Sequence, residues 1–133
     1  MKTIIVDDEI WAIEQLKNSF NGKPGIELEG CFRDPLQALS HAENHTVDFA
    51  LLDVKMNGMD GIELGRRLRR LYPTVIIVYV SSYPEYFSDA YRDVRADYYM
   101  LKPYREEDIT DVLERVMLLS KRQKKRAQIR TFG

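Results

Sequence analysis

The stretch Thr3-Ile4-Ile5-Val6-Asp7-Asp8-Glu9 shows the pattern from which the fold can be predicted, because a short run rich in β-branched residues ends in acidic side chains. Similar apolar runs occur at Phe49–Leu52 and Val75–Val80, and weaker strand candidates lie at Ile26–Cys31 and Asp97–Leu101. Unbroken apolar runs of this length are typical of strands buried on both faces, as in a parallel sheet. The chain is therefore expected to contain five strands.

Amphipathic stretches separate these runs. The first covers residues 10–20, and Asp34-Pro35 then supplies an N-cap followed by a first-turn proline, which opens a second helix. Asp60 precedes a third helical stretch, and two more apolar stripes follow at residues 83–94 and 109–119. Five strand-then-helix units in order predict a doubly wound α/β fold, with a five-stranded parallel sheet, five helices and right-handed crossovers.

The composition indicates one soluble, cytoplasmic domain. The chain has 133 residues, 44% of them hydrophobic and 31% charged, and no apolar run approaches the ~20 residues of a membrane-spanning helix. Its start lacks the basic-then-apolar layout of a signal peptide, and the single Cys31 excludes an internal disulfide. We expect no membrane contact and no redox role for this thiol.

Charge is distributed unevenly along the chain. Residues 1–120 hold all 21 acidic residues and 14 of the 20 basic ones, a net charge of −7. Residues 121–133 carry the other six basic residues and no acid. We interpret 1–120 as the folded domain and 121–133 as a basic linker. A solvated linker and a segment that touches nucleic acid both fit such a tail.

Polar residues follow the expected strands. In an open parallel sheet, ligands bind beyond the carboxyl ends of the strands. The first strand ends in Asp7-Asp8-Glu9, the third in Asp53, the fourth in Ser81-Ser82 and the fifth in Lys102-Pro103. We therefore expect these groups to converge on one edge of the sheet.

Carboxylates brought together in this way repel one another unless a cation lies between them. Mg²⁺ prefers carboxylates, carbonyls and water as ligands, so the acidic edge suits this ion. A metal there would neutralise an incoming phosphoryl group, and one carboxylate would act as the nucleophile. Lys102 offers a positive charge to a phosphate oxygen, and Ser81 offers a hydroxyl. These residues together predict phosphoryl transfer to an aspartate.

Four segments in this order resemble the receiver domains of two-component response regulators. They are Val6–Glu9, Leu52–Gly61, Val80–Ser82 and Asp97–Pro103. The likeness covers roughly residues 1–120, and each segment closes an expected strand. It implies a CheY-like domain with the flavodoxin-like strand order 2-1-3-4-5. It also implies a signalling switch, not an enzyme, which receives its phosphoryl group from a sensor histidine kinase.

The resemblance implies a role for each acidic residue. Asp53 would be the phosphoacceptor and, with Asp8, would bind Mg²⁺ directly, whereas Asp7 would act mostly through water. The backbone carbonyl of Lys55 would be a further metal ligand, so the side chain of this residue need not matter for binding.

The other implied roles concern the phosphoryl group and the switch. Ser81 would hydrogen-bond the phosphoryl group, and Lys102 would form an ion pair with it. Tyr99 matches the aromatic switch position, and the Lys102–Pro103 bond is typically cis in the family. On phosphorylation, Ser81 would move toward the phosphoryl group and Tyr99 would turn inward. The surface that changes would be formed by the fourth helix, the fifth strand and the fifth helix.

Two other functions stay open. A haloacid-dehalogenase-like phosphohydrolase needs a second Asp two residues after the nucleophile, and Lys55 stands there. A receiver-like interaction module that works without phosphate is the other alternative. His41 and His45 lack the zincin spacing and a third ligand, so we interpret them as surface residues.

The fourth apolar stripe and the end of the chain bear on partners. The stripe of Tyr83, Tyr86, Phe87 and Tyr91 fits core packing and fits a partner-binding or homodimer face equally well. The segment 128–133 reads as a strand and resembles the opening of a SARP-type output domain, while Tyr83–Tyr91 resembles receivers joined to LytTR-type output domains. We infer a receiver from a longer DNA-binding transcription regulator, in which an output domain outside this chain binds DNA.

Overall fold

The computed structural model describes residues 1–132, with side chains as far as Ile129. It contains one five-stranded parallel sheet in the predicted order β2-β1-β3-β4-β5. The strands are β1 (Lys2–Val6), β2 (Glu27–Phe32), β3 (Phe49–Leu52), β4 (Ile76–Ser81) and β5 (Tyr98–Leu101). The helical segments are α1 (Ile10–Phe20), α2 (Pro35–Asn44), α3 (Gly61–Leu71), η1 (Pro84–Tyr86), α4 (Phe87–Asp89), η2 (Ala90–Val94) and α5 (Glu106–Phe132).

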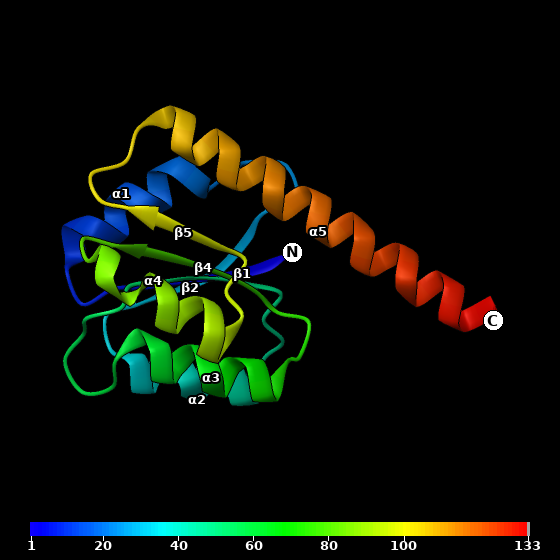
Figure 1. Cartoon of the computed structure of the whole chain (residues 1–133), viewed down its shortest axis with the longest axis horizontal. Coiled ribbons are helices and arrows are strands. Elements are labelled where there is room, and N and C mark those ends of the chain that lie inside the picture. Colours follow the sequence, from blue (N-terminus) through cyan, green and yellow to red (C-terminus); the bar gives the residue numbers. More distant parts are fainter. Residues whose placement is uncertain (133) are drawn as a thin grey trace.

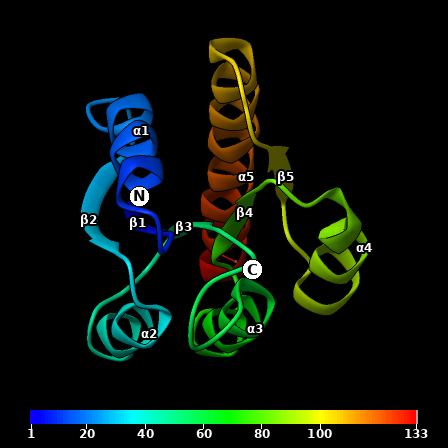
Figure 2. The same ribbon diagram turned by 90° about the vertical axis from the view of Figure 1, so that its left-hand side faces the viewer.

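Helices cover both faces of the sheet. α1 and α5 lie on one face, and α2, α3 and α4 lie on the other (Figures 1 and 2). Each face has its own apolar core: Ile5, Leu51 and Val78 face α1 and α5, whereas Leu52 and Ile77 face α2 and α3. Neighbouring residues of the central strands thus enter opposite cores, because side chains alternate along a strand. This double burial explains why the strands read as unbroken apolar runs.

The predicted helix starts are confirmed by their caps. Asp34 precedes α2, and its side chain accepts a hydrogen bond of 2.9 Å from the amide of Leu36. Asp60 precedes α3, and its carboxylate accepts one of 2.8 Å from the amide of Glu63. Each cap satisfies an amide that has no partner within its own helix. The start of α3 matters for function because it directly follows the loop after β3.

The fourth helical segment differs from the prediction. The apolar stripe predicts one regular helix, yet this part of the chain is a 3₁₀ turn, a single α turn and a π turn in succession. Ala90 and Val94 are buried, while Phe87 and Tyr91 are 57% and 66% exposed. A stripe with a period of 3.6 residues does not keep one face when the helix changes type, so these rings leave the core. Core packing is therefore the wrong interpretation for Phe87 and Tyr91.

The strand expected at residues 128–133 is also wrong for the described residues. Residues 128–132 continue α5, which projects from the body of the molecule (Figure 1), and Gly133 lies outside the described part of the chain. The preceding residues 121–128 are all Lys, Arg, Gln or Ala, which are good helix formers, and residues 121–132 contain no Gly or Pro that would end the helix. α5 also crosses the domain boundary predicted after residue 120, which stays a prediction. No described helix has the length and apolar character needed to cross a membrane.

Candidate functional site

Three acidic residues meet at the carboxyl edge of the sheet. Val6 pairs with Leu52 in the β1–β3 register, so the residues that follow these two strands lie side by side. Asp7, Asp8 and Asp53 each bring a carboxylate oxygen within 4.8 Å of the others. The convergence expected from the topology is therefore present, and it forms the acidic cluster of this site.

Lys102, which directly follows β5, supplies a positive charge to the acidic cluster. Its Nζ lies 2.7 Å from Asp7 Oδ2 and 3.7 Å from Asp53 Oδ2. The amide of Lys102 donates to the carbonyl of Ser81 over 2.9 Å, which extends the β4–β5 ladder by one residue, and the Lys102–Pro103 bond is cis as expected. One lysine among three carboxylates leaves the cluster with a negative charge that a divalent cation would neutralise.

The donor set of the cluster fits Mg²⁺. All three side-chain donors are hard carboxylate oxygens, which suit this ion. The amide of Glu9 donates to Asp7 Oδ1 over 3.0 Å, and the amide of Asn57 reaches Asp8 Oδ2 over 3.3 Å. The backbone thus holds these carboxylates toward one another although they repel. The carbonyl of Lys55 as a fourth protein ligand stays a prediction.

Burial and a neighbouring negative charge raise the pKa of Asp53. Its side chain is 11% exposed, and burial, together with the charge of Asp7, raises its pKa from 3.8 to about 6. Lys102 and the hydrogen bond from the Val54 amide, 2.8 Å from Oδ1, oppose this shift. Burial alone would lower the pKa of Lys102, but its hydrogen bond to Asp7 and the charge of Asp53 raise it. The ionised form of Asp53 is thus disfavoured without metal.

This shift predicts how the stability of the metal-free protein depends on pH. Because the folded pKa of Asp53 exceeds its unfolded value, the folded state binds more protons between about pH 4 and pH 6, and stability falls as pH rises through that window. Asp53→Asn removes the free-energy cost of keeping a buried carboxylate ionised beside Asp7. It should therefore stabilise the metal-free protein by roughly 1–3 kcal/mol at pH 7.

Urea unfolding in EDTA measures this effect at each pH. The gain from Asp53→Asn should vanish below about pH 4, and Mg²⁺ should stabilise the parent more than the variant. Equal unfolding free energies of parent and variant at pH 7 without metal would contradict the repulsion inferred here.

Ser81 and Tyr99 connect the site to the loop that follows β4. Ser81 is fully buried, and its hydroxyl oxygen accepts a hydrogen bond of 3.1 Å from the amide of Tyr83. Tyr99 is half-buried, and its hydroxyl donates to the carbonyl of the same Tyr83. Its ring packs edge-on against Phe87 at 5.7 Å between centroids. One loop residue therefore contacts both members of the predicted switch pair, whose roles stay predictions.

The Lys55 side chain contacts two tyrosines that follow β4. Its Nζ is 4.7 Å from the centroid of the Tyr83 ring and 5.7 Å from that of Tyr86. A cation held over aromatic faces is attracted by their quadrupoles. This contact joins the loop after β3 to the loop after β4, so Lys55 bridges both segments that flank Asp53 and Ser81.

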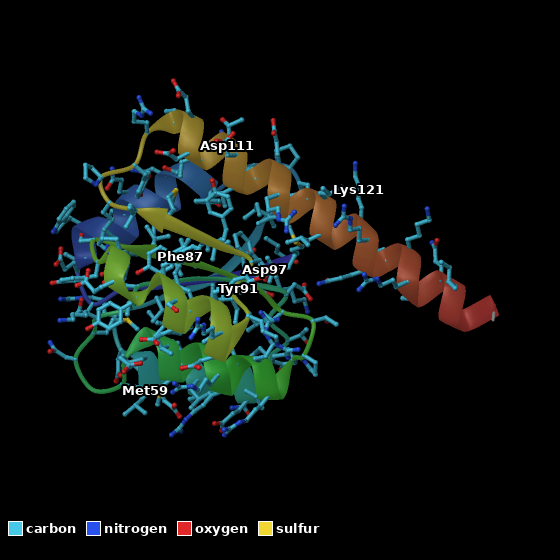
Figure 3. All side chains as sticks on the ribbon, in the orientation of Figure 1. Met59, Phe87, Tyr91, Asp97, Asp111 and Lys121 are labelled. Carbon is cyan, nitrogen blue, oxygen red and sulfur yellow. The ribbon has the colours of Figure 1, made fainter. Side chains whose placement is uncertain are left out.

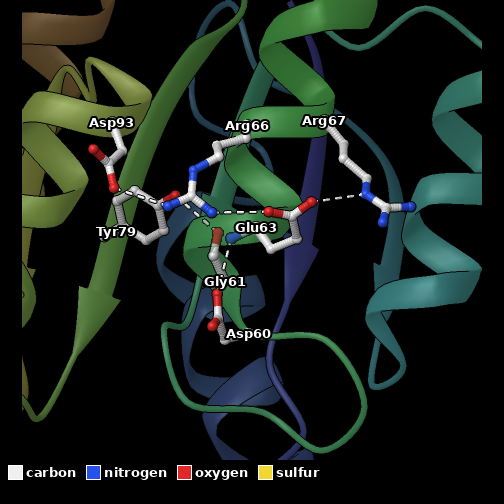
Figure 4. Close-up of polar contacts among 7 residues, drawn as sticks. All are labelled: Asp60, Gly61, Glu63, Arg66, Arg67, Tyr79 and Asp93. Atoms are coloured by element: carbon white, nitrogen blue, oxygen red, sulfur yellow. Dashed lines mark hydrogen bonds and ion pairs between the residues drawn. The ribbon is translucent and has the colours of Figure 1, made fainter.

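The start of α3 is anchored by a residue that the sequence analysis does not single out. The hydroxyl of Tyr79, a fully buried residue of β4, donates to the Gly61 carbonyl over 2.8 Å (Figure 4). The amide of Gly61 in turn donates to the Val54 carbonyl over 2.7 Å. Tyr79 thus ties the end of the loop that carries Lys55 and Asn57 to the sheet. The spacing of Gly61 and Gly65 on one helical face was the available signal of close packing.

Arg66 links α3 to η2 at the surface. Its guanidinium lies 2.8 Å from Glu63 and 2.8 Å from Asp93, and Arg67 also reaches Glu63 over 3.1 Å (Figure 4). These side chains are 34–45% exposed, so solvent screens the attraction within each pair. The network orients the elements and adds little stability.

The histidine pair and the cysteine carry no site of their own. His41 and His45 stack at 4.5 Å between ring centroids; His45 is exposed and His41 is partly buried. Within residues 1–129, the acidic cluster is the single group of three metal-ligating side chains. Cys31 is half-buried, and burial raises the pKa of its thiol.

A flavodoxin-like sheet whose carboxyl edge carries three aspartates and a lysine defines the class of response-regulator receiver domains. The chain belongs to this family, because the sequence model of the response regulator receiver domain matches residues 3–114. The comparisons thus confirm the resemblance noted in the sequence.

Named relatives agree with this assignment. Transcriptional regulatory protein YpdB of Escherichia coli K12 is 31% identical over 116 residues, which cover 87% of this chain and 47% of that protein. Sensory transduction protein LytT of Bacillus cereus is 29% identical over 134 residues, covering 98% of this chain and 51% of LytT. The chain therefore spans about half the length of these relatives.

The fold of a solved receiver is closely similar. The response regulatory domain of protein mrkE from Klebsiella pneumoniae superposes with a TM-score of 0.81 at 28% identity, covering 94% of this chain and 99% of that domain. Most of this chain, including the acidic cluster, thus falls within one receiver fold.

Proposed function

We propose that a sensor histidine kinase phosphorylates this cytoplasmic receiver on Asp53 in a reaction that requires Mg²⁺. The observation that carries the proposal is the acidic cluster, with three carboxylate oxygens within 4.8 Å and Lys102 Nζ 3.7 Å from Asp53. No other group of described residues joins a buried nucleophile, hard metal donors and a cation in this way. Membership of the receiver family makes the chain part of a signalling switch.

The reaction follows from the groups around Asp53. A carboxylate oxygen of Asp53 attacks the phosphorus, the P–N bond of the kinase phosphohistidine breaks, and its electron pair stays on the imidazole nitrogen. Asp7, Asp8, Asp53 and the carbonyl of Lys55 would hold Mg²⁺, which when bound offsets the negative charge of the phosphoryl oxygens.

Two further groups complete the site in this proposal. Lys102 offers its ammonium to a phosphoryl oxygen, and Ser81 offers its hydroxyl as a hydrogen-bond donor. Because these groups act on a phosphoryl group bonded to the chain itself, we infer that the protein assists only its own phosphorylation and dephosphorylation. The chain is then a switch and not an enzyme.

Intact-mass spectrometry after incubation with acetyl phosphate and Mg²⁺ tests this proposal, with Asp53→Asn as the control. A chain that gains no phosphoryl group under any condition would instead be a receiver-like module that works without phosphate.

We further propose that phosphorylation acts on the surface formed by α4, β5 and α5. Tyr83 contacts both Ser81 and Tyr99 through its backbone, so a shift of Ser81 toward a phosphoryl group would reach Tyr99 through this loop. Phe87 of α4 and Tyr91 of η2 lie on this side (Figure 3), and their rings stack with centroids 6.5 Å apart. Exposed stacked rings of this kind suit a protein partner, and we infer a homodimer of the phosphorylated form.

Sedimentation with and without acetyl phosphate and Mg²⁺ tests the switch. We expect the parent to move from monomer to dimer on phosphorylation. Tyr91→Ser should accept phosphate but stay monomeric, because it removes apolar area from the contact. Tyr99→Ala should do the same, because it breaks the link between the Tyr83 loop and β5. A parent protein that stays monomeric with and without phosphorylation would contradict the homodimer. A Tyr99→Ala variant that still dimerises on phosphorylation would contradict the role of Tyr99 in the switch.

The length of the relatives supports the presence of a second domain in the full protein. Because the chain spans about half of YpdB and LytT, we propose that it is the receiver of a DNA-binding transcription regulator. The likeness to LytT and the helical course of residues 128–132 favour a LytTR-type output domain over a SARP-type one. DNA would then be bound by the output domain. The coding sequence that follows residue 133 tests this directly, and a stop codon there would reject it.

A further inference from the structure

A cavity lies at the opposite edge of the sheet from Asp53. It has a volume of about 290 Å³ and is bordered by the α3–β4 turn, the segment between η2 and β5, and the middle of α5. Thr74 and Asp97 precede β4 and β5, so this is the amino-terminal edge of the parallel strands. Four arginines line it, Arg69, Arg95, Arg122 and Arg126, against one carboxylate, Asp97.

Arg69 is a fixed part of the cavity wall. It donates to the carbonyl of Val94 over 3.1 Å and to that of Arg95 over 3.0 Å, and also to the carbonyls of Pro73 and Val75. Its guanidinium lies 3.6 Å from Asp97, whose Oδ2 also accepts a hydrogen bond from the Ile77 amide. The one acid of the cavity is therefore already engaged by Arg69 and the backbone.

The other three arginines have no such partner. Within the part of the chain whose side chains are described, no carboxylate forms an ion pair with Arg95, Arg122 or Arg126. Arg122 and Arg126 are four residues apart on α5, a spacing at which like charges destabilise a helix. Arg95 has a positive φ of 56°, a conformation in which glycine is the usual residue. Arg122 and Arg126 thus repel each other, and all three arginine side chains are exposed and have no carboxylate partner among the described residues.

The α5 wall of this cavity is held in place although the helix projects from the body. Gln123 Nε2 donates to the carbonyl of Thr74 over 2.7 Å, between the turns that carry Arg122 and Arg126. This contact sets the helix against the α3–β4 turn, so the arginines face a defined cavity. The lysines of the same segment lie elsewhere: Lys121 borders a groove with Lys23 and Pro24, and neither Lys124 nor Lys125 lines the arginine-lined cavity.

We propose that this arginine pocket, formed by Arg95, Arg122 and Arg126 over Arg69, binds a phosphate-type oxyanion. The guanidinium fork matches two phosphate oxygens at once, and the lining carries a net charge of +3 when Asp97 is counted. The anion is either a phosphate of a nucleic-acid backbone or a free phosphate-bearing molecule. The pocket lies at the opposite edge of the sheet from the acidic cluster and shares no lining residue with it.

The decisive comparison is between two variants that lose the same charge. Arg95→Gln/Arg122→Gln/Arg126→Gln empties the pocket of its free arginines, while Lys121→Gln/Lys124→Gln/Lys125→Gln removes three charges outside it. Arg69 is left intact because it clamps four carbonyls, and circular dichroism verifies the fold of both variants. All measurements use the full chain with Asp53→Asn, in EDTA, so that the acidic cluster cannot bind phosphate through a metal.

The probes are pyrophosphate, followed by NMR titration, and a labelled DNA duplex, followed by fluorescence anisotropy. We expect the lysine variant to bind like its parent and the arginine variant to bind about tenfold more weakly or worse, because it loses several charge-assisted hydrogen bonds. The amides of Thr74, Arg95 and Gln123 should shift with pyrophosphate.

Two outcomes identify the source of the anion, and both support the pocket. Tighter binding of DNA than of pyrophosphate, with a salt slope that falls by about one for each arginine removed, indicates a nucleic-acid backbone. Pyrophosphate binding without DNA binding indicates a free phosphate-bearing ligand. Three results would overturn the proposal: no binding of either probe, equal weakening in the arginine and lysine variants, or amide shifts confined to residues outside the pocket.

Discussion

Acetyl phosphate and Mg²⁺ should add one phosphoryl group to the parent chain and none to Asp53→Asn. Asp53 Oδ2 lies 3.7 Å from Lys102 Nζ, and burial raises the pKa of Asp53, so a cation bound at the acidic cluster would favour its ionised, nucleophilic form. Asparagine keeps the size of the side chain but replaces the nucleophilic oxygen pair by a neutral amide. The expected effect is all-or-none in an intact-mass spectrum, the largest among our predictions.

The controls of this experiment distinguish loss of the phosphoacceptor residue from loss of metal binding. EDTA should abolish the adduct on the parent, and Asp8→Asn should reduce its yield, because the cluster then lacks one of its three carboxylates. An adduct on both parent and Asp53→Asn would mean that another residue is the acceptor. Since Asp53→Asn should stabilise the metal-free fold, loss of the adduct in this variant cannot be ascribed to unfolding.

Gly61→Ala should destabilise the protein by about 3 kcal/mol or more, which lowers Tm by roughly 10 °C. A Cβ at this position would lie 1.8 Å from the carbonyl oxygen of Asp53, 2.8 Å from its carbonyl carbon and 2.9 Å from the Cα of Val54. All three atoms belong to the backbone that presents the phosphoacceptor. To relieve these clashes, the start of α3 must move away from the loop after β3. This movement breaks the hydrogen bond from the Tyr79 hydroxyl to the Gly61 carbonyl.

Gly65→Ala provides a matched control in the same helix. Its Cβ would lie 2.1 Å from the Tyr79 hydroxyl oxygen and 2.8 Å from Val94 Cγ1, both of which are side-chain atoms. Adding Tyr79→Phe removes the first clash, so it should recover part of the stability lost in Gly65→Ala and none of that lost in Gly61→Ala. Urea unfolding of the four variants measures this difference. A Gly61→Ala protein as stable as the parent would refute the close contact between α3 and Asp53.

Much of this fold can be predicted from the sequence, because the patterns that mark its strands and helix starts are local. β-Branched apolar runs mark the buried strands, and Asp34 and Asp60 mark helix starts through hydrogen bonds to amides two and three residues away. The acidic cluster could be predicted for a related reason. In a parallel sheet every carboxyl end falls on the same edge, so residues that directly follow the strands must be neighbours. The strand ends and the sheet topology are therefore sufficient to predict that Asp7, Asp53 and Lys102 lie close together.

Features that depend on distances through space required the tertiary structure. Phe87 and Tyr91 have the spacing of core residues, and only the change of helix type in their segment exposes them. Tyr79 reads as one more residue of an apolar strand until its hydroxyl is seen to hold Gly61. The raised pKa of Asp53 depends on how deeply the carboxylate is buried beside Asp7. The arginine pocket joins residues from three distant segments, which no local pattern connects. Local patterns thus suffice to predict the fold, and the strand ends together with the parallel topology suffice to predict the acidic cluster. Exposure, packing and electrostatics could be learned only from the three-dimensional arrangement, because they arise between residues that are distant in the chain.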